Sequence, residues 1–458
     1  MAISNEQSIL SMLKVWYKDG VENLMFRNSP VLRKLNKTRV EGKVQNFSAM
    51  YGRGGACGGD FMKASTLAST VSKNVEFSVE PGQIFSVYTM NAKEVQASKT
   101  QRGAYMKIAG SKMFAASEGF RKVMAAALYG RGYGELCLIP GSTSLSSSPV
   151  AVTLPADAIM KIDVGSQLVV KTSIDATSVA ATITVTQING NSVTVTSDTT
   201  YTTNATDVLC LAGSMDASGN PLLPVGLAGW LPTVAKRSGA TWTTYIGTKF
   251  FNVYRNVASD RLAGAFYAAS ASNEKYSVSI QALIKKLRRQ GSVCDMIVLN
   301  DDDFAKLSSE IETTNTFFTS TATKEKKNAA IGVSEISAAF STNFVENLYD
   351  DCYCPKGRFY VLDTSAVEIW SYTNVDKLDD GIVGNNAGKQ DPMSMDAEGK
   401  EDSPYALIID DYLNVKPGAD TVDGPSTQVS LQFYGSFVVT NPSVCGVGEF
   451  IDSTDFDA

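Results

Sequence analysis

Residues 275–307 read KYSVSIQALIKKLRRQGSVCDMIVLNDDDFAKL. From Lys275 to Gln290 the apolar residues recur every three or four positions, which is the period of a helix with one buried face. Four cations gather towards its C-terminal end, where they complement the helix dipole, and Gly291 predicts the end itself. Met296–Leu299 is wholly apolar, as in a buried strand, and Asn300 can cap a second helix. The stretch therefore predicts a helix–strand–helix unit.

Upstream, a much longer amphipathic helix is predicted from Gln101 to Tyr129, roughly 40 Å long at the usual rise per residue. Before it, residues 45–99 alternate loosely around Pro81-Gly82, which predicts an extended arm containing a two-stranded hairpin. Met50–Phe61 is rich in glycine and is predicted to be the mobile tip or hinge of that arm. Since such an arm buries little by itself, we expect it to lie on a neighbouring copy of the chain.

Two further regions have a β pattern. From about Pro149 to Gly213 the chain is rich in Val, Thr, Ala, Ser and Ile, and Asn189-Gly190 is a strong hairpin signal. We expect a barrel or sandwich of five or six strands there, with about sixty residues. Near the C-terminus, Thr427–Thr440 predicts a long closing strand that completes a sheet begun much earlier.

The composition excludes several function classes. The 458 residues, 44% apolar and 19% charged, suffice for two or three packed units of a globular protein. Without a histidine, Ser-His-Asp and Cys-His catalysis and the common histidine metal sites are excluded. Seven scattered cysteines do not form the framework of a secreted disulfide scaffold, so reduced thiols are expected. No apolar run is long enough to span a membrane and the first residues predict no signal peptide, so we expect assembly in a cytoplasm.

Charge is distributed unevenly along the chain. Residues 1–130 hold 18 basic and 9 acidic residues, a balance of +9, whereas residues 341–458 hold 6 basic and 21 acidic residues, a balance of -15. The middle segment is balanced, with 17 of each. The two ends can attract each other between copies, or they can be two independently solvated surfaces.

The acidic cluster Asp301–Asp303 has two readings, a divalent metal site or the favourable first turn of a helix. The spacing lacks the glycine and the distal glutamate of a calcium loop, which favours capping. Asp350-Asp351 is predicted to be a solvated turn. The glycine motifs match no phosphate-binding loop, so no catalytic, cofactor-binding or metal-ligating residue is predicted.

The order of these elements resembles the major capsid proteins of tailed bacteriophages, with the Hong Kong 97 (HK97)-like fold. The run Ile280–Leu307 resembles that family's axial-domain segment, and FYGSFVVTNP at 433–442 resembles its terminal peripheral-domain strand. The resemblance implies an α+β HK97-like capsid fold with an N-terminal arm, an extended E-loop, a long spine helix, peripheral and axial domains, and an inserted β-barrel or sandwich lobe.

The domain boundaries implied by the resemblance cover the whole chain. They are 1–44 for the N-terminal arm, 45–100 for the E-loop arm, 101–148 for the spine helix and the start of the peripheral domain, 149–213 for the β insertion, 214–272 for the continuation of the peripheral domain, 273–426 for the axial domain, and 427–458 for the returning strand and C-terminus.

The implied function is non-catalytic self-assembly, as hexamers and pentamers, into the icosahedral head of a double-stranded-DNA phage. The implied partners are copies of the chain, a separate scaffolding protein, a portal, a decoration protein and packaged DNA contacted non-specifically, with no membrane and no cofactor. The candidate contacts between subunits are Trp16, Arg53, Lys63, Phe77 and Phe85. The alternatives are an encapsulin-like protein compartment and, more remotely, a magnesium-dependent hydrolase using Asp301–Asp303 and Asp350-Asp351.

Some relatives crosslink a lysine of the arm to an asparagine of a neighbouring subunit. Lys63 and Lys73 lie in the arm and Asn441 near the final strand, but no motif matches residue by residue, so no crosslink is expected.

Overall fold

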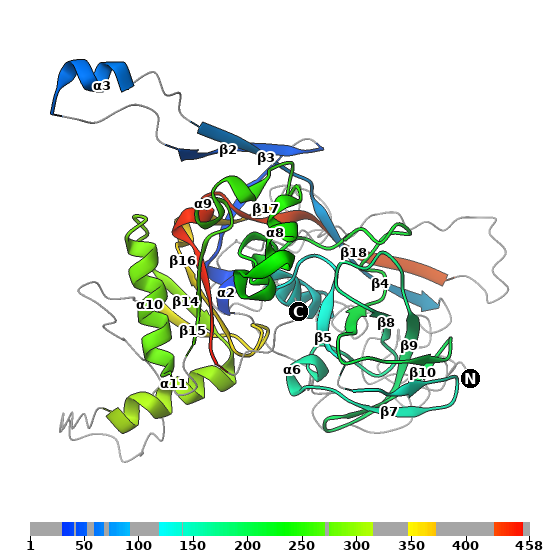
Figure 1. Cartoon of the computed structure of the whole chain (residues 1–458). Helices are drawn as coiled ribbons and strands as arrows, with labels where there is room; N and C mark the ends of the chain where they lie inside the picture. The colour runs from blue at the N-terminus through cyan, green and yellow to red at the C-terminus, as the bar shows by residue number, and fades with distance from the viewer. Residues whose placement is uncertain are drawn as a thin grey trace, which may run out of the picture. The chain divides into compact units, whose positions relative to one another are not determined.

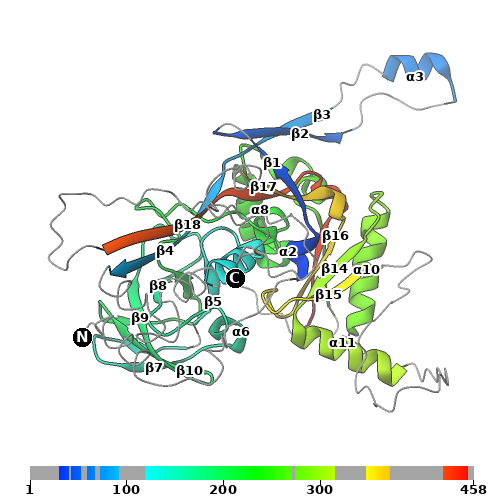
Figure 2. The same cartoon turned by 180° about the vertical axis from the view of Figure 1, so that it is seen from behind.

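The computed structural model describes residues 30–40, 43–52, 59–67, 73–91, 119–139, 141–270, 274–314, 347–371 and 426–451 (Figures 1 and 2). The chain divides into two compact units. One consists of Met1–Asn28, Gln83–Met124 and Ser371–Gly435, and the other of Ser29–Gly82, Ala125–Trp370 and Ser436–Ala458. Among the described helices, none is long and apolar enough to cross a membrane.

The larger unit contains a five-stranded mixed sheet in the order β13 (Ala265–Ala268), β19 (Gly446–Glu449), β16 (Arg358–Leu362), β14 (Met296–Leu299) and β15 (Asn347–Asp350). The pairs β13–β19 and β14–β15 are parallel, whereas β16 is antiparallel to both of its neighbours.

Helix α10 (Tyr276–Arg288) covers this sheet with an apolar face, and α11 (Asp301–Thr314) follows β14. The α10 side chains of Ile280, Leu283 and Leu287 are fully buried in the core of the sheet. The predicted helix–strand–helix unit is thus confirmed. The strands β13 and β19, which complete the sheet, come from either side of residues 273–426.

A second sheet has the order β1, β17, β18 and β4. In the larger unit, β1 (Asn36–Arg39) follows α2 (Pro30–Lys34), and β17 (Val367–Ser371) lies between β1 and the final residues of β18 (Ser426–Val439). In the smaller unit, β4 (Gly82–Asn91) pairs with the earlier residues of β18. The long closing strand predicted near the C-terminus is confirmed.

The predicted hairpin around Pro81-Gly82 is wrong. β3 (Lys73–Val79) instead pairs antiparallel with β2 (Gln45–Gly52), and β4 continues to the other sheet. The physical reason is a close approach of two backbones: a Cβ atom on Gly82 would lie 2.3 Å from the backbone nitrogen of Pro224. The glycine is needed for this contact and not for a turn.

The β-rich segment forms its own small core. Its six-stranded antiparallel sheet has the order β5 (Glu135–Leu138), β12 (Val208–Leu211), β8 (Gln167–Lys171), β9 (Ala181–Asn189), β10 (Ser192–Ser197) and β7 (Val150–Thr153). β6 (Ser144–Leu145) and β11 (Tyr201–Thr202) form a two-stranded sheet, and α6 (Ala156–Ile159) follows β7. We call this part of the chain, residues 135–211, the β lobe.

The β lobe confirms the predicted strands and the Asn189-Gly190 turn, where Gly190 has a φ of +56°. Its two sheets form a sandwich-like core and the larger sheet is open, with β5 and β7 at its edges. The lobe begins earlier than the predicted position 149, because Leu136 and Leu145 already contribute to its core.

Only the end of the predicted spine helix falls within the described residues. Residues 119–128 are helical, with Phe120, Met124 and Leu128 buried. Short elements follow the β lobe, in the order α7 (Leu227–Trp230), η1 (Val234–Arg237), α8 (Gly239–Gly247), η2 (Arg255–Val257) and α9 (Ser259–Leu262).

Candidate assembly surface

An aromatic cluster anchors the base of the arm, meaning the β2–β3 ribbon together with α3 (Phe61–Leu67). Phe47 and Phe77 lie opposite each other in the ribbon, with ring centroids 5.1 Å apart and nearly parallel planes. Phe77 also lies 5.5 Å from the ring of Trp230, which is fully buried and donates its indole N–H to the carbonyl of Phe437 at 2.7 Å. Because Phe77 is itself 0% exposed, it cannot be the contact between subunits that the sequence predicted.

Hydrogen bonds to its backbone groups fix the same ribbon. The amide of Ser78 in β3 donates to the carbonyl of Phe251 at 3.0 Å, and Arg261 donates to the carbonyl of Tyr51 at 2.5 Å. Phe251 and Asn252 form a tight turn with φ values of +45° and +69°. A bulky residue such as phenylalanine adopts that conformation only where its surroundings impose it. Here the Phe251 ring centroid lies 5.3 Å from that of Trp230. We call Trp230 and the aromatic rings around it, which fix the base of the arm, the Trp230 socket.

The far end of the arm is exposed. α3 lies beyond the end of the β2–β3 ribbon (Figure 1), and its first turn is capped by Asp60, whose carboxylate accepts the amide of Met62 at 2.9 Å. Phe61 and Met62 are 82% and 72% exposed, and Met50 in β2 is 65% exposed. Large apolar side chains grouped at this exposure are typical of a protein–protein contact.

The other predicted contact residues have different outcomes. Lys63 is exposed on α3 and stays a candidate. In the smaller unit, Phe85 is 46% exposed and its ring meets that of Tyr434 edge-on, with centroids 5.6 Å apart. It also stays a candidate. Trp16 and Arg53 lie outside the described residues, as do residues 53–58 of the glycine-rich stretch.

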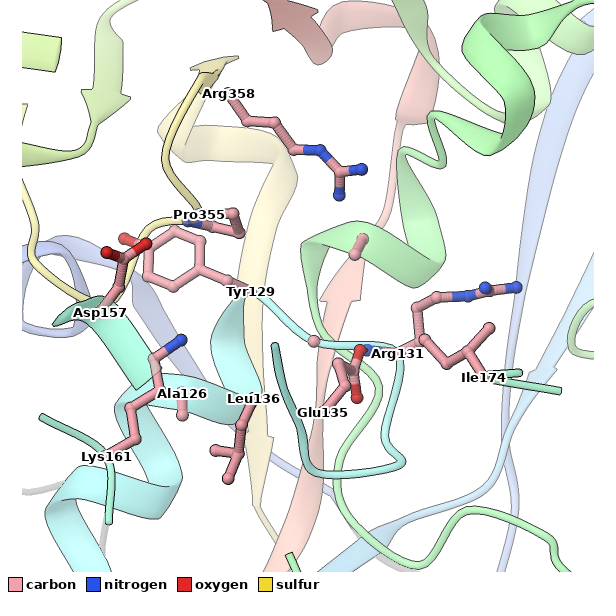
Figure 3. A pocket seen from close by; sticks show the side chains of 12 residues that line it. Ala126, Tyr129, Arg131, Glu135, Leu136, Asp157, Lys161, Ile174, Pro355 and Arg358 are labelled. Atoms are coloured by element: carbon pink, nitrogen blue, oxygen red, sulfur yellow. The ribbon is translucent and has the colours of Figure 1, made fainter. Parts of the chain in front are cut away.

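A small pocket lined by both charged and apolar side chains lies where the chain enters the β lobe, and Figure 3 shows its lining side chains. Its volume of about 40 Å³ is suited to a few water molecules and not to a metabolite. The Tyr129 hydroxyl at its edge donates to the Asp351 carboxylate at 2.8 Å, and both burial and that charge raise the pKa of Tyr129. Glu135 accepts the amide of Arg131, while its other carboxylate oxygen is buried without a hydrogen-bond partner.

Ion pairs near the pocket join distant segments. Arg358 forms a buried ion pair with Glu449, the residue opposite it across β16 and β19, at 3.3 Å. Arg131 lies 3.4 Å from Asp175 and over the ring of Tyr245 at 4.7 Å. These contacts join segments that are distant in the sequence, so the charged side chains of Arg131 and Arg358 have a structural role here.

The acidic cluster forms the first turn of α11, and Asn300 caps that helix. The Asn300 side chain accepts the amide of Asp302 at 3.0 Å, and the Asp303 carboxylate accepts the amide of Gly357 at 2.6 Å. Burial raises the pKa of Asp303. Asp302 forms an ion pair with Lys356 at 2.9 Å. Within the described residues no group of three acidic or cysteine side chains is placed to hold a metal ion.

One turn prediction fails, because Asp351 is only 1% exposed and accepts hydrogen bonds from Tyr129 and Tyr353. The six described cysteines are free and buried, and burial raises the pKa of Cys137, Cys210 and Cys445 to about 12. These three are therefore protonated core residues.

Sequence reasoning also missed Arg255, which is buried, donates to the carbonyl of Gly229 at 2.9 Å and lies 4.0 Å from the ring centre of Phe250. Desolvation lowers its pKa. Because Arg255 lies in a segment without hydrophobic periodicity, the sequence does not indicate that it is buried. The apolar, proline-rich run before Trp230, in contrast, does indicate a buried indole.

Comparisons with known proteins find no matching family model and no curated protein of similar sequence. Among solved structures, the chain shares a mixed α+β fold with a phage capsid subunit. The structure that shows this similarity of fold is the capsid asymmetric unit of cyanophage A-1(L). It matches with a TM-score of 0.52 and 12% identity over 94% of this chain and 95% of that chain.

Lower-scoring matches include the capsid of a native GTA particle, with a TM-score of 0.45 and 8% identity over 98% of both chains. A holo-encapsulin complex from Synechococcus elongatus matches with a TM-score of 0.41 and 8% identity over 98% of this chain and 96% of that chain.

Proposed function

We propose that this chain is the major capsid protein of a tailed double-stranded-DNA bacteriophage. Copies of it assemble as hexamers and pentamers into an icosahedral head, in the host cytoplasm, and remain in the virion. The observation that carries the proposal is a capsid-subunit fold that spans nearly the whole chain. The arm end supports it, since Phe61 and Met62 are exposed as expected of a side chain that a neighbouring copy covers.

In this proposal the parts of the chain have separate tasks. Residues 45–100 are the E-loop arm, and 101–129 is the spine helix, of which the described end is buried. The β lobe is an addition to the minimal capsid fold, placed between the spine and the axial domain. The axial domain is built on the five-stranded sheet with α10 and α11. The role is structural, and the histidine-free composition supports a shell without catalysis.

The proposed partners are copies of the chain, with a separate scaffolding protein that directs assembly, a portal at one vertex and a decoration protein outside. Packaged DNA contacts the inner surface through non-specific charge.

The test is expression of the full chain together with the scaffolding protein, followed by sedimentation and negative-stain electron microscopy. We expect closed particles tens of nanometres across. The paired substitution Phe61→Ser with Met62→Ser removes the apolar end of the arm and should lower particle yield at least tenfold while leaving the circular dichroism spectrum of the subunit unchanged. A matched pair, Val164→Ser with Val293→Ser, removes apolar groups that are also exposed, at 61% and 69%, but lie away from the arm, and should assemble normally.

The proposal would be refuted if the unchanged chain gave monomers and no particles. Particles that contain protein cargo and no nucleic acid when recovered from infected or prophage-bearing cells would instead favour an encapsulin-like compartment.

A further inference from the structure

An open groove runs between the β lobe and helix α8. Its volume is about 650 Å³, within the range of about 300–1,000 Å³ typical of sites that enclose a compact ligand. The side chains of Ile174, Val208 and Val234 line it and are each at most 5% exposed, so they form its apolar floor. The groove lies wholly in the larger unit of the chain.

The wall formed by α8 presents a row of small hydroxyl side chains. Thr241, Thr244 and Thr248 are exposed and line the groove at helical spacing, one turn apart. Each offers a methyl group for apolar contact, and the hydroxyls of Thr241 and Thr244 can donate to an incoming backbone. The Thr248 hydroxyl donates to the carbonyl of Tyr245 at 2.6 Å and can only accept. Tyr245, half-buried beside them, is held by Arg131 over its ring.

The rim of the groove carries a negative charge. Asp175 is 62% exposed while its partner Arg131 is almost buried, so the carboxylate is the group that faces solvent. The pair places an acidic acceptor next to an apolar floor.

The end of the arm has the matching chemistry. Phe61 and Met62 are adjacent, apolar and more than two-thirds exposed, and Lys63 follows directly as an exposed cation. The groove has room for two such side chains, and the lysine is then next to the acidic rim. Removing the apolar surface of a phenylalanine and a methionine from water stabilises such a contact.

We propose that the groove between the β lobe and α8 of one copy receives the arm end of a second copy, with Phe61 and Met62 on the apolar floor and Lys63 paired with Asp175. This inference rests on the proposed function and names the surface that the arm meets. It also assigns the β lobe a task, since Ser173, Asp175 and Thr206 of the lobe form one side of the receiving site.

The test uses crosslinking between two tagged versions of the full chain, both with Cys57→Ser, since the six other cysteines are buried. One version carries Phe61→Cys and the other Thr244→Cys, and they are co-expressed with scaffold. A short bis-maleimide joins them by adding one thiol across each of its double bonds, with no leaving group. We expect a crosslinked pair that contains both tags, formed in assembled particles. In a control, Thr186→Cys replaces Thr244→Cys, because Thr186 is exposed on β9 outside the groove.

A second measurement fills the groove. Thr244→Trp should lower particle yield at least tenfold, whereas Thr243→Trp, an exposed neighbour on α8 that does not line the groove, should leave the yield unchanged. Normal particles without the mixed crosslink, together with normal assembly of Thr244→Trp, would overturn the docking site and leave the capsid function intact. No particles from the unchanged chain would overturn both.

Discussion

Trp230 connects the arm to the rest of the larger unit, and its removal tests that connection. The indole is fully buried, and its ring centroid lies 5.0–6.1 Å from those of Phe47, Phe77, Phe250 and Phe251. Truncation of a buried Trp to Ala costs about 3–5 kcal/mol through lost contacts and the cavity that remains. It also leaves the buried carbonyl of Phe437 without its hydrogen-bond donor. That loss costs about 1–3 kcal/mol, which is not simply additive with the cost of the lost contacts.

We therefore expect Trp230→Ala to lower the Tm of unassembled subunits by about 5 °C or more, measured by differential scanning calorimetry. Trp242→Ala is the matched control. Trp242 is only half-buried on α8, stacked near Tyr245 with centroids 6.3 Å apart, and its removal should shift the Tm by a third of that amount or less. Equal shifts for the two variants would refute the view that the arm base depends on the Trp230 socket.

Three further predictions concern backbone approach and buried charge. Gly82→Ala forces a Cβ into a neighbouring backbone and should cost about 2 kcal/mol or more in urea unfolding, whereas Gly247→Ala meets no atom within 4 Å and should be neutral or stabilising; similar effects of both would contradict the close approach. Asp303→Asn should flatten the dependence of stability on pH. Burial raises the pKa of Asp303 in the folded chain, so the stability that its protonated carboxyl contributes is present below the ordinary Asp pKa and is lost as pH rises through the folded pKa. Parallel Tm profiles of the variant and the wild-type chain from pH 4 to 7 would refute this. Arg358→Met leaves the charge of Glu449 buried and should cost about 3–5 kcal/mol in denaturant unfolding, most of which the double variant with Glu449→Met should restore; no recovery in the double variant would show that the pair is not coupled.

Elements that follow a strict period could be predicted from the sequence. The α10 pattern and the closing strand were predicted correctly, because helical spacing or alternation marks the buried face of each directly. The wholly apolar run Met296–Leu299 was predicted correctly because it marks a strand buried on both faces. Asn189-Gly190 was equally clear, since its turn chemistry fixes the hairpin locally.

Elements that depend on partners distant in the sequence could not be predicted. Pro81-Gly82 has the local chemistry of a turn, but the close approach of Pro224 decides its conformation, and nothing local records that contact. Phe77 lies in the alternating apolar pattern of the arm, which marks one face of the strand but not what covers that face; Trp230 of the same chain covers it. The groove beside α8 is lined by segments dozens of residues apart, so no local pattern predicts it. The exposed apolar pair on α3, in contrast, lies within the arm that the sequence indicated as the assembly element.

The most direct test of the account is a cryo-electron-microscopy reconstruction of particles made by the full chain with its scaffold. The account predicts a closed shell with pentameric and hexameric capsomers, in which density for residues 61–63 of each subunit meets an adjacent subunit. A chain that stays monomeric under these conditions, or a shell in which Phe61 faces solvent in every subunit, would contradict it.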